Sequence, residues 1–385
     1  MSGAASGGRV ASPVAEARHR VLFKDPFSYC AHPHIAALPD GDLLMVFNRA
    51  PRRHVILHPP QEPLFYNVIM RSSDGGESWS APQVAPDYDW HGVECAGLTA
   101  LADGGVMLNQ WRFRWYPLDL ARKRTATETL AMPSAWVGAL AGSLELDSGA
   151  DLAGRAEALA PWARGGDAAY VHLSADGGRS FETTIRLDTT PFVGGYGMRG
   201  AARLPGGELV LPLCDIPAYQ RIFVVRSSDG GRSWGPAIAA AALDGRKFEE
   251  PAPLALPDGR IVMLLRENVS RRLWQVASSD GGLSWNRPEP TPIDGYPGHL
   301  LALSDGRILC VYGHREPDFS IRAVQSMDGG RSWSVETTGT IRGALPNKDL
   351  GYPSSVQRPD GTVLTVYYAQ EDDGVTSIQA TWSRP

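Results

Sequence analysis

Titratable side chains recur at a fixed distance from tight turns in this sequence of 385 residues. Glu250 lies eight residues before Asp258 and Arg266 eight residues after it, so we expect the two to be cross-strand neighbours. Tyr352 lies eight residues before Asp360. Carboxylate, guanidinium and phenol groups transfer protons and bind anions. A group of such polar and charged side chains is unlike a packed apolar core. Because they have equal offsets from their turns, they indicate a polar site where these equivalent strand positions meet.

Other polar residues hold the same offsets about further turns. They are His32 with Asn48 and Arg49, Trp111 with Arg112, and Gly313 followed by His314 and Arg315. His34 follows His32 on the same segment. We therefore expect all of these residues at one rim, where they would bind an anionic ligand with Tyr352, Glu250 and Arg266.

The elements that position this rim are six hairpins. Six times, an apolar run is followed by a tight turn and a second apolar run. The turns are Asp40-Gly41, Asp103-Gly104, Gly206-Gly207, Asp258-Gly259, Asp305-Gly306 and Asp360-Gly361. Asp-Gly between apolar runs is a strong hairpin signal, because Gly supplies the positive φ that the turn needs.

A second repeat, Ser-x-Asp-x-Gly-x-x-Trp/Phe, alternates with these hairpins. Its five copies begin at Ser72, Ser174, Ser227, Ser278 and Ser326. The last four copies are spaced by roughly 50 residues, a period typical of propellers or solenoids. The side chains of this motif stabilise turns, so the motif indicates architecture and not chemistry. The prediction is an all-β, six-bladed β-propeller of four-stranded blades.

The chain ends after the third strand of the sixth unit, so we expect Arg20 to Phe23 to supply the missing outer strand. Residues 1–19 are then a flexible tail and residues 20–385 a single propeller. The sixth blade would be closed by the N-terminal segment, which leaves no sheet edge unpaired.

One segment does not fit the repeat. Phe113 to Asp167 is predicted to be an insertion in the second blade, with a helical stretch from Asp151 to Leu159 and exposed Trp136 and Trp162. If the tight turns share one face of the ring, this insertion overhangs the opposite, funnel face, where the polar rim lies. An oligomer through the insertion is one expectation.

Composition and net charge argue against some classes of binding partner. A net charge of −5 and a pI near 6.0 give no electrostatic footprint for nucleic acid or an anionic membrane. The first 19 residues lack the apolar region of a signal peptide, so we expect a cytoplasmic protein without membrane spans. Cys30, Cys95, Cys214 and Cys310 are far apart, which favours buried thiols over zinc or disulfides. No cofactor and no metal are expected.

In its hairpins and its Ser-x-Asp-x-Gly-x-x-Trp/Phe repeats, the chain resembles the sialidase superfamily of six-bladed propellers with Asp-box (BNR) repeats. The resemblance implies that Tyr352, in Gly351-Tyr352-Pro353, is a nucleophile and that Glu250 activates it. It also implies that Arg266 and Arg315 clamp a substrate carboxylate. A phenol needs such a base because its ordinary pKa is near 10.

Two departures from the family modify this expectation. The chain has Ala31-His32-Pro33 where the family has a clamp arginine, and the segment from Pro51 to Leu64 lacks the family's acidic Asp. That segment offers His54, His58 and Glu62 instead. The prediction is therefore an exo-acting glycosidase for a terminal acidic sugar other than sialic acid, with His32 as a further catalytic candidate.

Two other functions stay open at this point. One is a propeller polysaccharide lyase, in which His32, His34, His91 or Tyr352 removes the proton next to a uronate carboxylate. The other is a non-catalytic propeller that binds glycan or protein, since fold alone does not establish chemistry.

Overall fold

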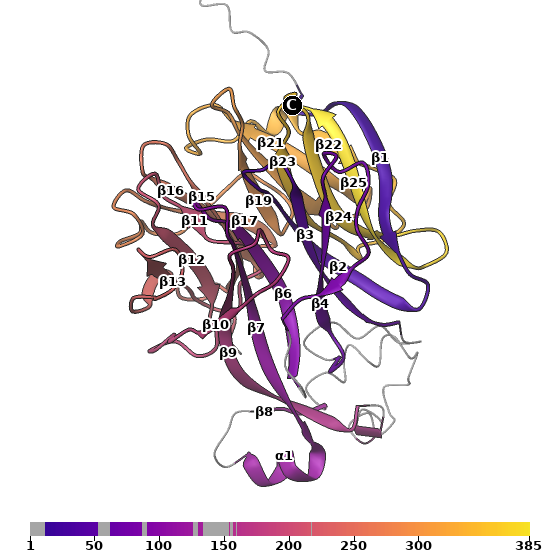
Figure 1. Cartoon of the computed structure of the whole chain (residues 1–385), viewed down its shortest axis with the longest axis vertical. Coiled ribbons are helices and arrows are strands. Elements are labelled where there is room, and N and C mark those ends of the chain that lie inside the picture. Colours follow the sequence, from indigo (N-terminus) through magenta and orange to yellow (C-terminus); the bar gives the residue numbers. More distant parts are fainter. Residues whose placement is uncertain are drawn as a thin grey trace, which may run out of the picture.

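The computed structural model describes residues 12–52, 62–86, 91–125, 130–133, 154, 157–158, 160–216 and 218–385. These residues form six antiparallel sheets that surround one axis, as the sequence predicts (Figure 1). The first strands of neighbouring sheets contact one another, for example β2 with β6 and β19 with β23. These first strands therefore line the axis of a six-bladed β-propeller.

The first three blades take their strands in chain order. Blade 1 contains β2 (Ser28–Ala37), β3 (Leu43–Pro51), β4 (Tyr66–Ser72) and β5 (Gln83–Val84). Blade 2 contains β6 (His91–Ala100), β7 (Val106–Pro117), β9 (Trp162–Ser174) and β10 (Thr183–Arg186), with β8 (Leu130–Ala131) beside β9. Blade 3 contains β11 (Ala202–Arg203), β12 (Leu209–Cys214), β13 (Ile222–Ser227) and β14 (Ile238–Ala241).

The other three blades repeat this order until the last strand. Blade 4 contains β15 (Phe248–Ala255), β16 (Ile261–Glu267), β17 (Arg272–Ser278) and β18 (Glu289–Pro290). Blade 5 contains β19 (Gly298–Ala302), β20 (Ile308–His314), β21 (Ser320–Ser326) and β22 (Gly339–Arg342), with a 3-10 turn at Val335–Thr337. Blade 6 contains β23 (Leu350–Gln357), β24 (Val363–Gln370), β25 (Thr376–Arg384) and the N-terminal β1 (Ala15–Lys24).

All six predicted tight turns are present. The second residue of each turn is a glycine with positive φ, between 81° at Gly361 and 92° at Gly207. A Cβ added at either glycine would meet no atom within 4 Å. Glycine is therefore needed at these turns for its backbone conformation and not for space.

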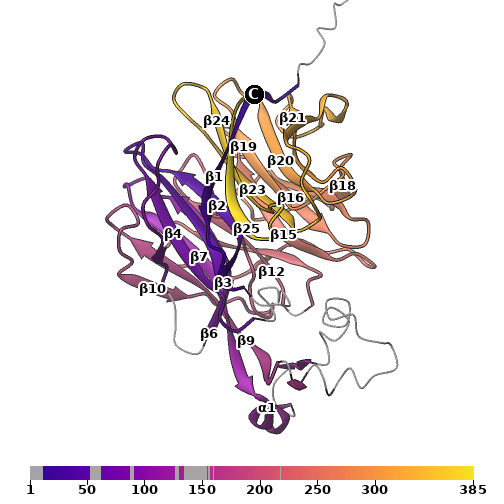
Figure 2. The ribbon, with the colours of Figure 1, turned by 90° about the vertical axis from the view of Figure 1, so that its right-hand side faces the viewer.

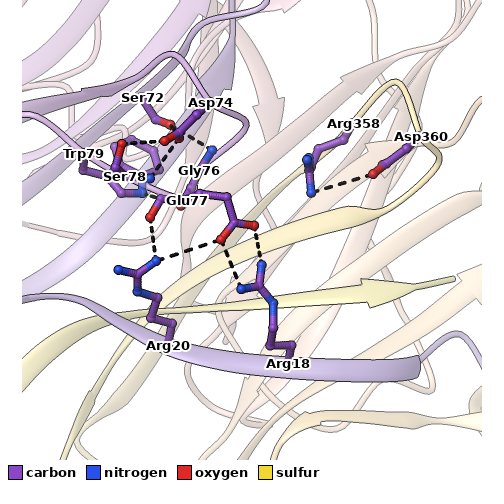
Figure 3. Close-up of polar contacts among 10 residues, drawn as sticks. All are labelled: Arg18, Arg20, Ser72, Asp74, Gly76, Glu77, Ser78, Trp79, Arg358 and Asp360. Atoms are coloured by element: carbon purple, nitrogen blue, oxygen red, sulfur yellow. Dashed lines mark hydrogen bonds and ion pairs between the residues drawn. The ribbon is translucent and has the colours of Figure 1, made fainter.

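The Ser-x-Asp-x-Gly motifs build identical turns between the third and fourth strands. In the first motif, Ser72 Oγ donates to Asp74 Oδ1 at 2.8 Å and accepts from the Gly76 amide at 2.8 Å. Asp74 also accepts the Ser78 amide at 2.8 Å (Figure 3). The hydrogen bonds from Ser78 and Ser72 lower the pKa of Asp74 to about 2. These residues stabilise the turns between strands, as the sequence predicts.

The ring is closed by β1. This strand pairs antiparallel with β25, from Ala15 opposite Arg384 to Lys24 opposite Ser377, and the pairing begins before the predicted start at Arg20 (Figure 2). It is also joined to blade 1, because Arg18 forms an ion pair with Glu77 and Arg20 Nη1 donates to the Glu77 carbonyl at 2.6 Å (Figure 3). Much of the predicted tail lies outside the described residues.

Both ends of the predicted insertion 113–167 belong to strands. β7 and β9 pair from Val106 opposite Ser174 to Pro117 opposite Trp162, with one register shift between Arg112 and Phe113. The α1 helix (Leu118–Arg124) follows β7 at the end of this long ribbon (Figure 1). Trp136 and most of Asp151–Leu159 lie outside the described residues. The place of the segment over the funnel face stays a prediction.

Apolar side chains fill the spaces between blades. Ile261 to Leu265 of β16 are all buried, as expected for a strand covered on both faces. The four cysteines are buried free thiols in this interior, as the sequence predicts. No helix in the described ranges is long and apolar enough to cross a membrane.

Candidate active site

Three inner strands carry a bulge at the residue that the sequence singles out. His32, Glu250 and Tyr352 have φ values of 55°, 51° and 51°, and each precedes a proline. The strand registers shift at these points, between Ala31 and His34, Glu249 and Ala252, and Gly351 and Ser354. Positive φ is uncommon for residues with a Cβ and costs about 1–3 kcal/mol each.

The bulges correct one detail of the predicted geometry. Equal counting from the turn places Glu250 opposite Arg266, but the register partner of Arg266 is Glu249. That prediction is wrong by one residue because Glu250 occupies the bulge. Backbone strain at three equivalent positions of one rim is characteristic of functional sites.

Tyr352, Glu250 and Arg266 form one contact network. The Tyr352 hydroxyl donates a short hydrogen bond to Glu250 Oε1. Arg266 Nη1 donates to both carboxylate oxygens of Glu250 at 3.1 Å. The side chains are buried, with Tyr352 6% and Glu250 3% exposed. The hydroxyl therefore has a direct path for transferring its proton to a carboxylate.

Two residues that the sequence reasoning missed hold Arg266. Its Nε donates to Asn268 Oδ1 at 2.9 Å and lies 3.2 Å from Glu249 Oε1. Asn268 Nδ2 in turn donates to Glu249 at 2.7 Å. Burial raises the pKa of Glu249, while Arg266 acts in the opposite direction. The tandem Glu249-Glu250 and the spacing Arg266-x-Asn268 are the sequence signals for this support.

Arg315 lies on the other side of Tyr352. Its Nε and Nη2 donate to the Leu350 carbonyl at 3.0 and 2.7 Å, and its guanidinium lies 5.4 Å from the centre of the Tyr352 ring. Tyr296, which the sequence reasoning also missed, lies 4.4 Å from the Arg266 guanidinium and 5.7 Å from that of Arg315. The two arginines therefore share one aromatic ring.

Each of these arginines keeps a free nitrogen. Among the described residues, neither Arg266 Nη2 nor Arg315 Nη1 has a hydrogen-bond partner. Two cations beside one tyrosine, each with unused N–H groups, form a site that favours an anionic group.

His32 lies against the nucleophile candidate. The ring centres of His32 and Tyr352 are 4.1 Å apart, with an angle of 69° between the planes. Asn48 donates to Asn67 Oδ1 at 2.5 Å through its Nδ2, so its Oδ1 faces His32 Nδ1 at 2.9 Å. This network assigns a proton to His32 Nδ1, which donates to Asn48 Oδ1.

Burial raises the pKa of Tyr352 well above its ordinary value, and the charge of Glu250 adds to the rise. Arg266 and Arg315 act in the opposite direction. The hydroxyl is therefore protonated at neutral pH, and the Glu250 carboxylate lies where it can accept its proton. The arginines reduce the cost of the negative charge that then develops on the oxygen.

The other predicted site residues have different surroundings. Arg49 forms an ion pair with Asp25 and donates to Ser28 Oγ at 2.9 Å, away from Tyr352. Arg112 Nη2 donates to the Tyr170 hydroxyl at 2.5 Å, and Trp111 is 1% exposed in the core.

Two predicted histidines also lie apart from the Tyr352 network. The Nε2 atom of His314 lies 3.2 Å from Asp318 Oδ1 on the same loop, and His34 is buried on an inner strand. His54 and His58 lie outside the described residues, as does the side chain of His91. Glu62 is 1% exposed and accepts the Leu64 amide at 3.1 Å. Among the described residues, no three His, Cys, Asp or Glu side chains gather as metal ligands would.

Comparisons with known proteins agree with this architecture. No curated protein sequence matches the chain. A protein of unknown function from Dyadobacter fermentans has a similar structure, with a TM-score of 0.79 and 22% identity over 96% of this chain and 99% of that one. The NanB sialidase of Streptococcus pneumoniae gives 0.64 and 12% over 97% of this chain and 70% of that one.

The intramolecular trans-sialidase of Ruminococcus gnavus gives a TM-score of 0.63 and 14% identity over 97% of this chain and 98% of that one. At these identities the similarity concerns the fold alone. The family model of the BNR repeat-like domain matches residues 157–365, which is more than half of the chain. The chain therefore belongs to the family of BNR repeat-like domains.

Proposed function

We propose that the protein is an exo-glycosidase that hydrolyses a terminal acidic sugar with Tyr352 as nucleophile. The observation that carries this proposal is the hydrogen bond from the Tyr352 hydroxyl to buried Glu250, between two arginines with free N–H groups. The sialidase-like fold supports the reaction class by analogy.

In the first step, the Tyr352 oxygen bonds to the anomeric carbon of the sugar and its proton passes to Glu250. The electron pair of the glycosidic bond leaves with the aglycone oxygen, which takes a proton from an acid group. In the second step, water gives a proton to the group that protonated the aglycone and bonds to the anomeric carbon. The bond from that carbon to the Tyr352 oxygen breaks, and the phenolate recovers its proton from Glu250. A neutral phenol suits a substrate that carries a carboxylate, because a carboxylate nucleophile would be repelled by it.

Arg266 Nη2 and Arg315 Nη1 would bind the substrate carboxylate. The guanidinium of Arg266 is held by Glu250, Glu249 and Asn268. Because three groups fix its orientation, a ligand meets a clamp that is already ordered.

His32 distinguishes this site from a carboxylate clamp of three arginines. It lies where the resembling family has an arginine, and its ring packs on Tyr352. Its imidazole would serve as an acid–base group, while the missing cation weakens the binding of a carboxylate at a quaternary carbon. We therefore propose an acidic sugar other than sialic acid as the preferred substrate.

A panel of aryl glycosides tests this proposal. Sialic acid, other ulosonic acids, uronic acids and neutral sugars would each be offered to the wild type and to Tyr352→Phe. Release of the phenol from an acidic sugar by the wild type, with loss in the variant, supports the proposal. Turnover of neutral sugars alone, or no turnover of any member, contradicts it; binding without turnover would favour a glycan-binding module.

The contact between His32 and Tyr352 favours one second candidate, a uronate lyase. There, Nε2 of His32 or the phenolate of Tyr352 would remove the proton next to a carboxylate neutralised by Arg266. Elimination leaves an unsaturated product that absorbs ultraviolet light, whereas hydrolysis does not. The absorbance of a polyuronate digest therefore distinguishes the two reactions.

A further inference from the structure

A chain of buried side-chain hydrogen bonds connects His32 in blade 1 with blade 2. His32 Nδ1 lies 2.9 Å from Asn48 Oδ1, and Asn48 Nδ2 donates to Asn67 Oδ1 at 2.5 Å. Asn67 Nδ2 then donates to Gln110 Oε1 on β7 at 2.8 Å. The three amide side chains are at most 2% exposed, so bulk water does not compete for these hydrogen bonds. A continuous series of amides therefore begins at the ring that packs on the nucleophile candidate.

The far end of this chain is fixed by a backbone carbonyl. Gln110 Nε2 donates to the Pro86 carbonyl, and it also lies 3.0 Å from Nε2 of His172. A carbonyl oxygen only accepts hydrogen bonds, so the nitrogen of the Gln110 amide, and not its oxygen, faces Pro86. The oxygen must then face Asn67. This anchor removes the freedom of the Gln110 amide to exchange its oxygen and nitrogen.

His172 supports the same orientation of Gln110. Burial and the charge of Arg112 lower the pKa of His172 to about 4, so the ring is neutral at neutral pH. Because the Gln110 nitrogen is a donor, Nε2 of His172 accepts. The single proton of the neutral ring is therefore on Nδ1, which donates to Thr184 Oγ1 at 2.9 Å. Both hydrogens of the Gln110 amide thus have acceptors.

With this end fixed, all donors of the chain point in one direction. Because Gln110 presents its oxygen, Asn67 presents its nitrogen to Gln110 and its oxygen to Asn48. Asn48 then presents its oxygen to His32 Nδ1. An acceptor opposite a ring nitrogen requires a proton on that nitrogen. The opposite orientation of all three amides would place the Gln110 oxygen against the Pro86 carbonyl, where neither atom is a donor.

The orientation of the His32 ring is fixed by its other contacts. Its centre lies 4.1 Å from that of Tyr352 and 5.4 Å from that of Tyr368. The side chain is only 5% exposed, so these rings leave it little room to turn. Amide side chains neither gain nor lose protons near neutral pH. The chain of amides therefore transmits orientation and not protons.

We propose that Asn48, Asn67 and Gln110 are positioning residues that keep a proton on Nδ1 of His32. A proton that this ring gains or loses is then carried by Nε2, whatever else that atom contacts. The tautomer follows from the hydrogen-bond chain and is the same for a glycosidase or a lyase. Its consequence for turnover rests on the proposed function, in which a fixed tautomer gives the acid–base group a single exchanging atom.

NMR of the ring nitrogens tests the tautomer without an assay of activity. The full chain is labelled with 15N in its histidines, and the His32 signals are identified by their loss in His32→Gln and by nuclear Overhauser contacts with the Tyr352 ring. From about pH 5 to pH 9, on both sides of the ordinary pKa of histidine near 6.5, Nδ1 should keep the shift of a protonated nitrogen. Nε2 should be unprotonated at the upper end. An unprotonated Nδ1 at any pH, or an Nε2 that stays protonated throughout, overturns the proposal.

A substitution in the middle of the chain tests whether the distant amides matter. Asn67→Leu removes the acceptor for Asn48 and the donor of the next hydrogen bond, so His32 should become a mixture of two tautomers. The matched control is Asn109→Leu, which removes an equally buried amide on β7 that donates to the Gly197 carbonyl at 3.0 Å. Both variants lose a buried hydrogen bond and should have a lower Tm, but the control should keep the wild-type shifts of His32. A pure wild-type tautomer in folded Asn67→Leu overturns the proposal.

Kinetics on the acidic glycoside connect the tautomer with turnover. Asn67→Leu should lower kcat by about 10-fold or more with KM nearly unchanged, because acid–base catalysis contributes about 10²–10⁴-fold. Gln110→Leu breaks the anchor and should act in the same direction, so the test does not depend on one variant. Asn109→Leu should retain nearly the wild-type kcat. A mixed tautomer with undiminished kcat contradicts the positioning role, whereas a wild type without turnover contradicts the proposed glycosidase and leaves the NMR result to decide the tautomer.

Discussion

Removal of β1 should break the closure of the ring. Deletion of Met1 to Lys24 removes the whole strand and leaves β25 as an exposed sheet edge. Deletion of Met1 to Ser12 leaves every residue of β1 in place. We expect the short deletion to retain the wild-type Tm, and we expect the long deletion to lower it strongly.

The size of the effect follows from the contacts of the strand. β1 pairs with β25 over most of its length, and a backbone hydrogen bond contributes a net value of about 1 kcal/mol. Phe23 packs on Phe47 with ring centres 5.3 Å apart. Full burial of such a side chain contributes about 1.5–3 kcal/mol, so partly buried Phe23 contributes less than that. The half-exposed pair of Arg18 and Glu77 adds at most about 1 kcal/mol.

The sum is several kcal/mol, which is comparable to the whole free energy of unfolding of a typical domain, about 5–15 kcal/mol. The long deletion should therefore be insoluble or should unfold roughly 10 °C below the wild type. Circular dichroism melts of both deletions measure this, with Phe23→Ala as an intermediate case. Cooperative unfolding of the long deletion at the wild-type Tm would refute the closure mechanism.

Three further outcomes are expected. Because burial lowers the pKa of His34 to about 3, the unfolded chain binds more protons below its ordinary pKa near 6.5. Stability should therefore fall as the pH drops from about 6.5 toward 4, by up to about 1.4 kcal/mol per pH unit for this residue, and His34→Gln should flatten that slope in urea titrations. Arg266→Lys keeps the charge but loses the planar fork held by Glu250 and Asn268, so KM for the acidic substrate should rise more than kcat falls; the reverse pattern would exclude a clamp. An aryl sialoside should be hydrolysed poorly or not at all, and rapid release of its phenol would show that His32 does not exclude sialic acid.

The architecture could be predicted because its signals are local. The glycine of each tight turn is fixed by its own φ, and the Ser and Asp of each Asp box bond to backbone within four residues. All the residues that such a turn needs lie within one short segment of the sequence. The N-terminal strand was predictable for a different reason, because a closed ring requires a partner for β25.

The position of the site residues along their strands was predictable, but their contacts were only partly so. Tyr352, Glu250 and Arg266 converge because the same offset recurs about each turn. Offset counting assumes a regular ladder, so it missed the bulges that turn Glu250 out of register with Arg266. It also gives no information on side-chain partners. Arg49, for example, forms an ion pair with Asp25, which lies on the loop before β2.

Sequence reasoning also missed Arg199, a buried residue that donates to the carbonyls of Gly298 and Pro353, and it did so for another reason. Arg199 lies one residue beyond the offset position in the third blade, which Met198 occupies. Its neighbours come from blades 2, 5 and 6, which are far away in the sequence. Contacts across the axis of a ring have no local sequence pattern, so only the assembled fold brings them together.

The proton path from Tyr352 to Glu250 is the centre of the proposed mechanism, and a double-mutant cycle on the acidic glycoside identified by the panel tests it most directly. Tyr352→Phe removes only the hydroxyl and should lower kcat by about 10²-fold or more with little change in Tm. Glu250→Gln should act on the same step, so the loss in the double variant should be smaller than the product of the two single losses. An undiminished kcat in Tyr352→Phe, or losses that multiply fully, would contradict the mechanism.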